Sequence, residues 1–286
     1  MRERSQNFDP RQVMQKSTFE IFHYHDPRPG TVEVHHHDFY EVYLLLSGNV
    51  AYWVEGRIIR LKPGDLLFIN PMELHRPLSD PENPVCERFV LWIDREYLAG
   101  LSTEHAPLAS CFDTQLPGHS HLIRLPSAER AAVTARMGEL VRESYGKDFG
   151  SKISAEGIFL QLMVQLNRLA FGATKQQEDE QLSPLVRKAM QHIAENLSTE
   201  LSLADIADKL FVSKYYLSHA FSREVGVSVY RYILLRRLMM ARQLLTDGEP
   251  AGQVCRSCGF ADYTSFYRAF KSEYGISPRE FTAGNT

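Results

Sequence analysis

The sequence predicts a mixed β + α fold: an N-terminal antiparallel β-barrel with two following helices, and a C-terminal all-α domain with two helix-turn-helix units. Short runs rich in β-branched and aromatic residues fill residues 18–93, and Gly and Pro separate them. The segment 172–182, GATKQQEDEQL, contains almost no apolar side chain and is typical of a linker. Beyond it helical periodicity continues almost to residue 286, and one amphipathic pattern returns forty-nine residues later.

The length and composition are those of a globular protein with two domains. The chain has 286 residues, of which 44% are hydrophobic and 23% charged. No run is long enough to span a membrane, and the polar start MRERSQNFDPRQ is unlike a signal peptide. Apart from Cys255 and Cys258, the four cysteines lie in distant segments, which is not the pattern of a disulfide framework. We therefore expect a cytoplasmic protein with no membrane partner.

The charge is distributed unevenly along the chain. The net charge is -3, but residues 184–286 carry 13 Lys/Arg against 10 Asp/Glu. This mild surplus permits nucleic-acid binding by the C-terminal domain without proving it.

The N-terminal region is predicted to consist of β-strands. Even spacing of the strand-like runs, with no helical segment between them, favours an antiparallel barrel or double-sheet roll. The runs are TFEIFHYH, FYEVYLLLSG, NVAYWVEG, RIIRL, DLLFINP and ERFVLWI.

A group of polar residues in these strands can face one site. His35 and His37 stand two apart, so on a strand they point to the same face, and Glu41 can join them. With His75 from a later strand, the group offers three imidazoles and a carboxylate, which suits a divalent transition metal. His36 should point to the opposite side and lie at the surface. Aromatic strand residues could stack on a sugar ring or simply belong to the core: Tyr40, Tyr43, Tyr52 and Trp53.

Two segments in this region resemble the motifs of the cupin superfamily. HHHDFYEVYLLLSG is similar to the first motif, H-x-H-x3-E-x6-G, and GDLLFINPMELH is similar to the second, except that Glu73 stands where glycine is usual. The resemblance implies a cupin-like barrel over residues 18–94. Cupins used as sensors often keep these histidines as pocket lining without an ion, so we expect no cofactor, with a divalent transition metal as the alternative. The expected ligand-binding set is His35, His37, Glu41, His75, Tyr43 and Trp53.

Two amphipathic helices are expected after an irregular stretch over residues 95–125. They cover Ser127–Tyr145 and about residues 151–171, and their apolar stripes must be buried. Either both pack on the barrel, or part of one forms a homodimer seam. The expected domains are residues 1–171 for ligand sensing and dimerisation, the linker 172–182, and residues 183–286 for DNA binding.

The C-terminal domain is predicted to contain two helix-turn-helix units. A short helix over Leu203–Leu210, a tight step and a polar helix over Ser213–Gly226 form the first unit. Tyr263–Tyr274 ends the second unit, and the segment Tyr230–Leu245 separates the two units as a rigid spacer. Cys255 and Cys258 align with apolar positions of the first unit, so we expect buried core residues rather than a zinc or redox site.

The exposed faces of the two polar helices are the expected DNA-contacting surface. Two recognition helices on one face can enter successive major grooves about 34 Å apart. Arg268 is the best candidate for a bidentate guanine contact, and Arg231 is expected at phosphate. The expected contact residues are Lys214, Tyr215, Ser218, His219, Ser222, Tyr263, Thr264, Tyr267, Arg268 and Lys271.

From about residue 185 to residue 281 the chain resembles the AraC/XylS family of bacterial transcription regulators. The similar segments are LADIADKLFVSKYYLSHAFSREVG, RRLMMARQLL and CGFADYTSFYRAFKSEYGISPREF. The resemblance implies a homodimeric, non-enzymatic regulator, an activator by expectation, that binds double-stranded promoter DNA and RNA polymerase. A small-molecule effector, with a sugar as one candidate, would bind in the cupin pocket.

Two other interpretations of the N-terminal domain stay open. One is a metal-dependent cupin enzyme or metal sensor fused to a DNA-binding domain, which the histidine–glutamate set supports. The other is a dimerisation domain that binds no ligand.

Overall fold

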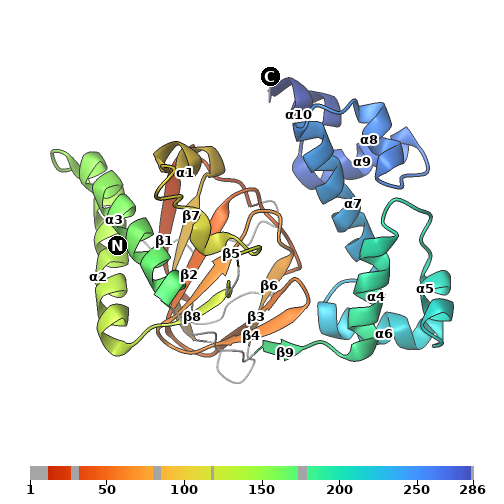
Figure 1. Ribbon diagram of the computed structural model, residues 1–286, viewed down its shortest axis with the longest axis horizontal. Coiled ribbons are helices and arrows are strands. Elements are labelled where there is room, and N and C mark those ends of the chain that lie inside the picture. Colours follow the sequence, from red (N-terminus) through yellow and green to blue (C-terminus); the bar gives the residue numbers. More distant parts are fainter. Residues whose placement is uncertain (1–11, 27–31, 80–84, 117–118, 173–178, 285–286) are drawn as a thin grey trace. The chain divides into compact units, whose positions relative to one another are not determined.

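The computed structural model describes residues 12–26, 32–79, 85–116, 119–172 and 179–284 (Figure 1). The chain divides into two compact units, residues 1–180 and 181–286. This division falls inside the predicted linker. Part of that linker is not a loop, because Asp179–Gln181 forms the strand β9 at the edge of an N-terminal sheet. Residues 173–178 of the linker lie outside the described residues.

The N-terminal unit contains two antiparallel sheets, as the sequence predicted. The first has the order β1-β7-β2-β5-β8 and the second β6-β3-β4-β9. The strands of the first sheet are β1 (Phe19–Asp26), β7 (Cys86–Ile93), β2 (Tyr40–Ser47), β5 (Asp65–Ile69) and β8 (Leu122–Arg124). The second sheet contains β6 (His75–Ser79), β3 (Val50–Val54), β4 (Arg57–Leu61) and β9.

Alternation along the strands creates two cores in this unit. On β2, Tyr43 and Leu45 face the interior between the two sheets, together with Tyr52 of β3. Val42 and Leu44 point the other way, into a core completed by the helices α2 (Ser127–Tyr145) and α3 (Ser151–Gly172). The predicted helices therefore both pack on the sheet, and this packing buries one stripe of each.

The predicted irregular stretch 95–125 is partly regular, which corrects the expectation. It contains α1 (Arg95–Leu101), a 3-10 turn (Ser110–Phe112) and β8. Asp94 caps α1 by accepting a hydrogen bond from the Tyr97 amide at 2.8 Å. Such short elements have too few residues for a periodic pattern, and tertiary contacts stabilise them instead.

The C-terminal unit is helical and confirms the two predicted helix-turn-helix units. Both recognition helices begin at a side-chain cap, Ser213 or Asp262, and both end at a left-handed glycine, Gly226 or Gly275. Cys255 and Cys258 lie in the apolar core of the second unit, as expected. The helices are α4 (Pro184–Glu195), α5 (Leu203–Lys209), α6 (Lys214–Val225), α7 (Val229–Thr246), α8 (Ala251–Ser257), α9 (Tyr263–Tyr274) and α10 (Pro278–Gly284).

Equivalent glutamates attach each recognition helix to the helix that precedes its unit. Glu224 of α6 accepts a hydrogen bond from the Ser183 amide at 2.8 Å, at the start of α4. Glu273 of α9 pairs with Arg231 of α7, with 2.8 Å between Oε2 and the guanidinium nitrogen. Arg237 of α7 donates to the backbone carbonyl of Leu197 after α4. These contacts hold the two helix-turn-helix units at a fixed spacing within the C-terminal domain. No helix in the described part of the chain is apolar enough over a sufficient length to cross a membrane.

Candidate ligand pocket and nucleic-acid interface

Three of the four predicted metal-binding residues converge inside the N-terminal unit. His37, Glu41 and His75 are buried, and one potential ligand atom from each lies within 4.8 Å of the others. His35 lies beside this cluster and is not a member of it. Its ring centroid is 4.3 Å from that of His75, and a single antiparallel bridge joins the two backbones. His37 and Glu41 of the first motif and His75 of the second are therefore brought together.

Backbone hydrogen bonds fix the tautomer of each histidine. The Nδ1 atoms of His35, His37 and His75 each lie 2.8 Å from a carbonyl oxygen, of Glu33, Phe39 and Glu73 respectively. A carbonyl oxygen only accepts, so each Nδ1 must carry the proton. In the neutral ring Nε2 is then left with a lone pair, which is the arrangement that second-shell carbonyls impose on metal-binding histidines.

The Nε2 atoms of His37 and His75 differ from their Nδ1 atoms in their hydrogen bonding. His37 Nε2 lies 3.3 Å from Glu41 Oε2, but the two atoms are not in hydrogen-bonding geometry. Glu41 Oε2 also accepts a hydrogen bond from Trp92 Nε1 at 3.0 Å. His75 Nε2 is fully buried and has no hydrogen-bond partner among the residues that the structure describes. Two imidazole nitrogens and a carboxylate oxygen within 4.8 Å of one another form a donor set that fits a divalent transition metal.

Burial keeps two of the rings neutral. Desolvation lowers the pKa of His35 to about 4, and the nearby His37 contributes in the same direction. Desolvation also lowers the pKa of His75 well below 6.5, assisted by His35 and His37. At neutral pH both rings are therefore hydrogen-bond acceptors or metal ligands and not cations.

The predicted aromatic ligands are separated by the structure. Tyr43 lies in the interior, where its ring meets that of Tyr52 edge-on at 5.1 Å and its hydroxyl lies 3.4 Å from Cys86 Sγ. Burial raises the pKa of both tyrosines well above 10. Trp53 is buried too, but alternation along β3 places it on the opposite face from Tyr52 and Val54. Trp53 is thus not brought together with Tyr43.

Sequence reasoning missed a group of half-exposed residues on the interior face. On β7, Arg88 and Trp92 stand an even number of residues from the buried Cys86 and Val90. All four side chains therefore point to the interior face. The Arg88 guanidinium carbon lies 4.8 Å from the ring centroid of Tyr24 on β1. The same alternation could have identified these residues in the sequence. They add a cation and two aromatic rings to the cluster's side of the sheet.

Two further positions differ from the motif-based expectation. His36 is buried and not at the surface, because residues 32–38 form only one isolated bridge and the strand alternation does not apply there. Glu73, which replaces the usual glycine, interacts with His121 at 3.0 Å and accepts a hydrogen bond from the Asn70 amide at 2.8 Å. The departure therefore adds polar contacts beside His75.

The recognition helices present the predicted contact residues toward solvent. On α6, Tyr215 and His219 are exposed and their rings stack at 6.3 Å. On α9, Arg268 is exposed, and hydrogen bonds from Ser265 lower the pKa of the capping carboxylate of Asp262. The remaining members of the predicted set are also exposed or half-exposed: Lys214, Ser218, Ser222, Tyr263, Thr264, Tyr267 and Lys271.

Arg231, which the sequence analysis expected at phosphate, differs from the predicted contact residues of α6 and α9. It is engaged by Glu273, so its guanidinium connects α7 to α9 inside the domain. The simplest role of this residue is to position α9.

Comparison with known proteins assigns both units. The AraC-like ligand binding domain matches residues 17–163, and a helix-turn-helix domain matches residues 206–284. The chain belongs to the AraC family of transcription regulators. It is a DNA-binding regulator of transcription with a ligand-binding domain.

Relatives of this AraC-family chain match most of its length. The HTH-type transcriptional activator RhaS of Escherichia fergusonii is 27% identical over 256 residues, covering 89% of each chain. RhaS of Salmonella paratyphi B is 28% identical over 256 residues, covering 87% of each. Among solved structures, the C-terminal domain of AraT, a response regulator from Geobacillus stearothermophilus, is 32% identical. That match covers 37% of this chain and 88% of the AraT domain, with a TM-score of 0.36.

Proposed function

We propose that this chain is a homodimeric, promoter-specific transcription activator. A small hydroxylated molecule of the sugar class controls it by binding in the N-terminal unit. The observation that carries the DNA-binding part is the pair of recognition helices. Both are capped at each end, and each is joined to a preceding helix by an equivalent glutamate. A rigid pair of this kind can read two successive major grooves.

The chemistry of the interior face supports a hydroxylated effector. The same face of the sheet carries the aromatic rings of Trp92 and Tyr24, the Glu41 carboxylate, which accepts from Trp92, and the Arg88 guanidinium, which lies over the Tyr24 ring. Sugars bind through this combination of apolar ring stacking and polar contacts at hydroxyl groups.

A DNA-binding measurement tests the proposal. Arg268→Ala should weaken binding to a promoter duplex by about 1–3 kcal/mol, because a bidentate arginine–guanine contact is worth that much. The measurement is fluorescence anisotropy on a labelled duplex at fixed salt, with an unrelated duplex of equal length as competitor.

The matched control is Arg142→Ala, which removes an exposed arginine from α2 of the N-terminal unit. It should leave the promoter affinity unchanged. Equal, sequence-specific binding by the Arg268→Ala protein and the wild type would remove Arg268 from the interface.

A metal sensor or metal-dependent enzyme is a second candidate, supported by the buried His75 Nε2 and the His37–Glu41 pair. His37, Glu41 and His75 would hold the ion, which would supply Lewis-acid chemistry at open coordination positions. Protein purified without chelator should then contain stoichiometric zinc, iron or manganese by mass spectrometry. His37→Ala should abolish that content, and replacement of the exposed His105 should not. Metal-free wild-type protein with full DNA response would reject this candidate.

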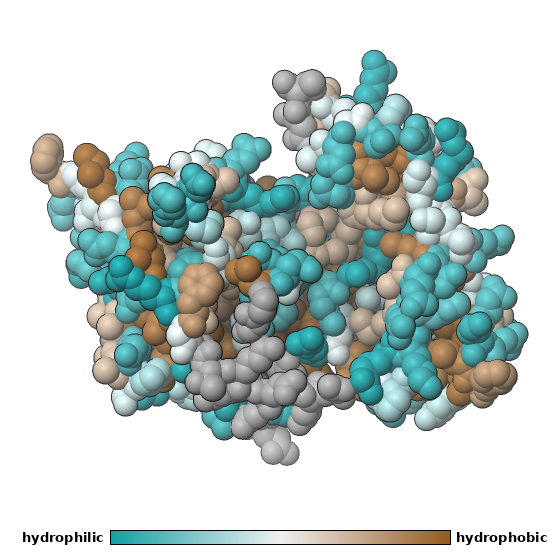
Figure 2. All heavy atoms as spheres, viewed as in Figure 1, coloured by the Kyte–Doolittle hydropathy of each residue, from teal (hydrophilic) through white to brown (hydrophobic). Residues whose placement is uncertain are grey.

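The proposed dimer rests on a second stripe of α3. Its buried stripe packs on the sheet, but Ile153, Leu160, Val164 and Phe171 are exposed at spacings of seven, four and seven. Such spacing is that of a coiled-coil seam. Gly157 lies on the same stripe with open space around it, which allows close approach of a second helix. Figure 2 shows hydrophobic side chains gathered among polar ones over the α2–α3 hairpin.

A further inference from the structure

The turn between α5 and α6 contains an unusual residue. Phe211 has φ of 56°, in the left-handed region that a bulky side chain rarely adopts. Its side chain is also 95% exposed. The strained backbone destabilises the folded state, and the exposed ring adds no burial that would offset this cost, so the residue at this position requires a reason.

The second helix-turn-helix unit provides an internal comparison. Gly259 occupies the equivalent position, with φ of 74°. The hydrogen bonds of the two turns match, because Val212 N donates to Ala207 O at 3.0 Å and Phe260 N donates to Cys255 O at 3.2 Å. The turn itself is therefore built equally well with glycine, and the phenylalanine is not needed for the fold.

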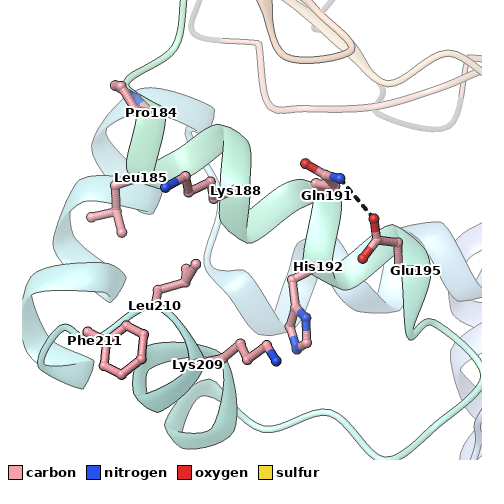
Figure 3. A pocket seen from close by; sticks show the side chains of 9 residues that line it. All are labelled: Pro184, Leu185, Lys188, Gln191, His192, Glu195, Lys209, Leu210 and Phe211. Carbon is pink, nitrogen blue, oxygen red and sulfur yellow. Dashed lines mark hydrogen bonds between the residues drawn. The ribbon is translucent and has the colours of Figure 1, made fainter.

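Phe211 lines a groove of about 450 Å³ between α4 and the end of α5. In Figure 3, Leu185 of α4 and the pair Leu210 and Phe211 border the same space. Lys188 and Lys209 flank this apolar floor from the two sides. Glu195, the one carboxylate among the described residues that line the groove, accepts a hydrogen bond from Gln191 Nε2 at 2.8 Å. The lining is thus apolar at its centre, and around it two lysines outnumber the one carboxylate.

We propose that this groove docks an acidic, amphipathic helix of RNA polymerase. The choice of this partner rests on the proposed activator function. Apolar side chains of such a helix would cover Leu185, Leu210 and Phe211, and its carboxylates would meet Lys188 and Lys209. The complementary charge favours this occupant over a basic or neutral helix. DNA is a poorer match for this groove, because the outer surface of its backbone is dominated by charged phosphates, whereas Leu185, Leu210 and Phe211 make the centre of the groove apolar.

The docking contact is tested by direct binding of the full-length protein to purified RNA polymerase holoenzyme, measured by biolayer interferometry without DNA. Phe211→Gly should weaken this binding at least tenfold, since it removes the central aromatic contact. The same change should keep or raise the melting temperature, because glycine accepts the left-handed backbone. Loss of polymerase binding with an undiminished melting temperature separates docking from folding. Lys188→Glu with Lys209→Glu should weaken binding to a similar extent through charge repulsion.

Matched controls come from an exposed turn of the N-terminal unit. Phe149→Gly and Lys147→Glu remove equally exposed side chains of the same types and should leave polymerase binding unchanged. Unchanged binding by the Phe211→Gly protein, or no binding by the wild type, overturns the proposal. Anisotropy on promoter DNA with the same samples tests the proposed function separately, because the groove lies outside the predicted DNA contacts.

Discussion

At the scale of single residues, burial in the N-terminal unit holds His35 and His75 as neutral rings. Each Nδ1 proton is committed to a backbone carbonyl, and burial opposes a second proton on His35 and His75. Protein interiors tolerate such nitrogens when a ligand donor or a cation satisfies them. The cluster is therefore organised before any ligand arrives, which reduces the entropy cost of binding.

The low pKa of His35 predicts a pH dependence of stability in metal-free protein. The pKa is about 4 in the folded state against 6.5 in the unfolded chain, so the unfolded chain binds the extra proton between these values. The stability contribution is complete above pH 6.5 and is lost as the pH falls toward 4. Between pH 7 and pH 5 the free energy of unfolding should decrease by about 2 kcal/mol from this residue alone.

Urea denaturation followed by tryptophan fluorescence measures this effect in the N-terminal unit alone. The chain has two tryptophans, Trp53 and Trp92, and both belong to that unit. His35→Gln, which does not titrate, should show a smaller loss of stability between the same pH values. An identical pH dependence in both proteins would contradict the assignment.

The sequence predicted polar residues best where a motif fixed their spacing. His37, Glu41 and His75 converge because each lies on or beside a strand at a position that the motif specifies. His36 was misplaced because alternation was assumed outside a regular strand. Phe211 was overlooked because its left-handed conformation depends on the turn geometry, which the aligned repeat with Gly259 could have indicated.

At the scale of elements, α3 has two apolar stripes with different roles. One is buried through Phe159, Leu162 and Leu166, and this stripe joins the helix to the first sheet. The other, around Leu160 and Val164, is partly exposed in the single chain. The sequence could predict the helix, but both stripes have the same period, so it could not predict which side packs within the chain.

The second stripe predicts a specific effect on assembly. Leu160→Lys should raise the dimer dissociation constant by about two orders of magnitude. A two-fold seam contains the substitution twice, and each lost central contact costs about 1–2 kcal/mol. Sedimentation equilibrium of the full chain measures the constant. Ser154→Lys, an exposed position of α3 outside the stripe, is the control and should dimerise normally. Equal dimerisation by both variants would place the seam elsewhere.

Short elements were predicted less well than long ones. The boundaries of α2 and α9 agree with the sequence prediction, since long periodic stripes and capping residues define them. The three-residue strands β8 and β9 were missed, because β8 exists through its pairing with β5 and β9 through its place beside β4. A residue pattern of that length carries no periodic signal.

At the scale of the whole molecule, the protein has one form that binds DNA well and another that binds DNA poorly. An effector can change DNA binding only if it binds these two forms with different affinities. The ligand cluster lies in one compact unit and the recognition helices in the other. The coupling free energy between the two sites is therefore the same for both ligands. The factor by which the effector changes the affinity for DNA must equal the factor by which DNA changes the affinity for the effector.

This reciprocity gives the last prediction. Monosaccharides that quench the tryptophan fluorescence are first selected from a panel, since Trp92 contacts Glu41 in the proposed pocket. A sugar that tightens promoter binding tenfold should itself bind tenfold more tightly when the promoter duplex is saturating. The Arg268→Ala protein, at a duplex concentration that it does not bind, should show the DNA-free sugar affinity. If the sugar changes promoter affinity while its own affinity is the same with and without DNA, it acts on the DNA or the assay and not through the pocket. A matched pair of shifts would place the controlling site in the N-terminal unit, because the fluorescence signal originates there.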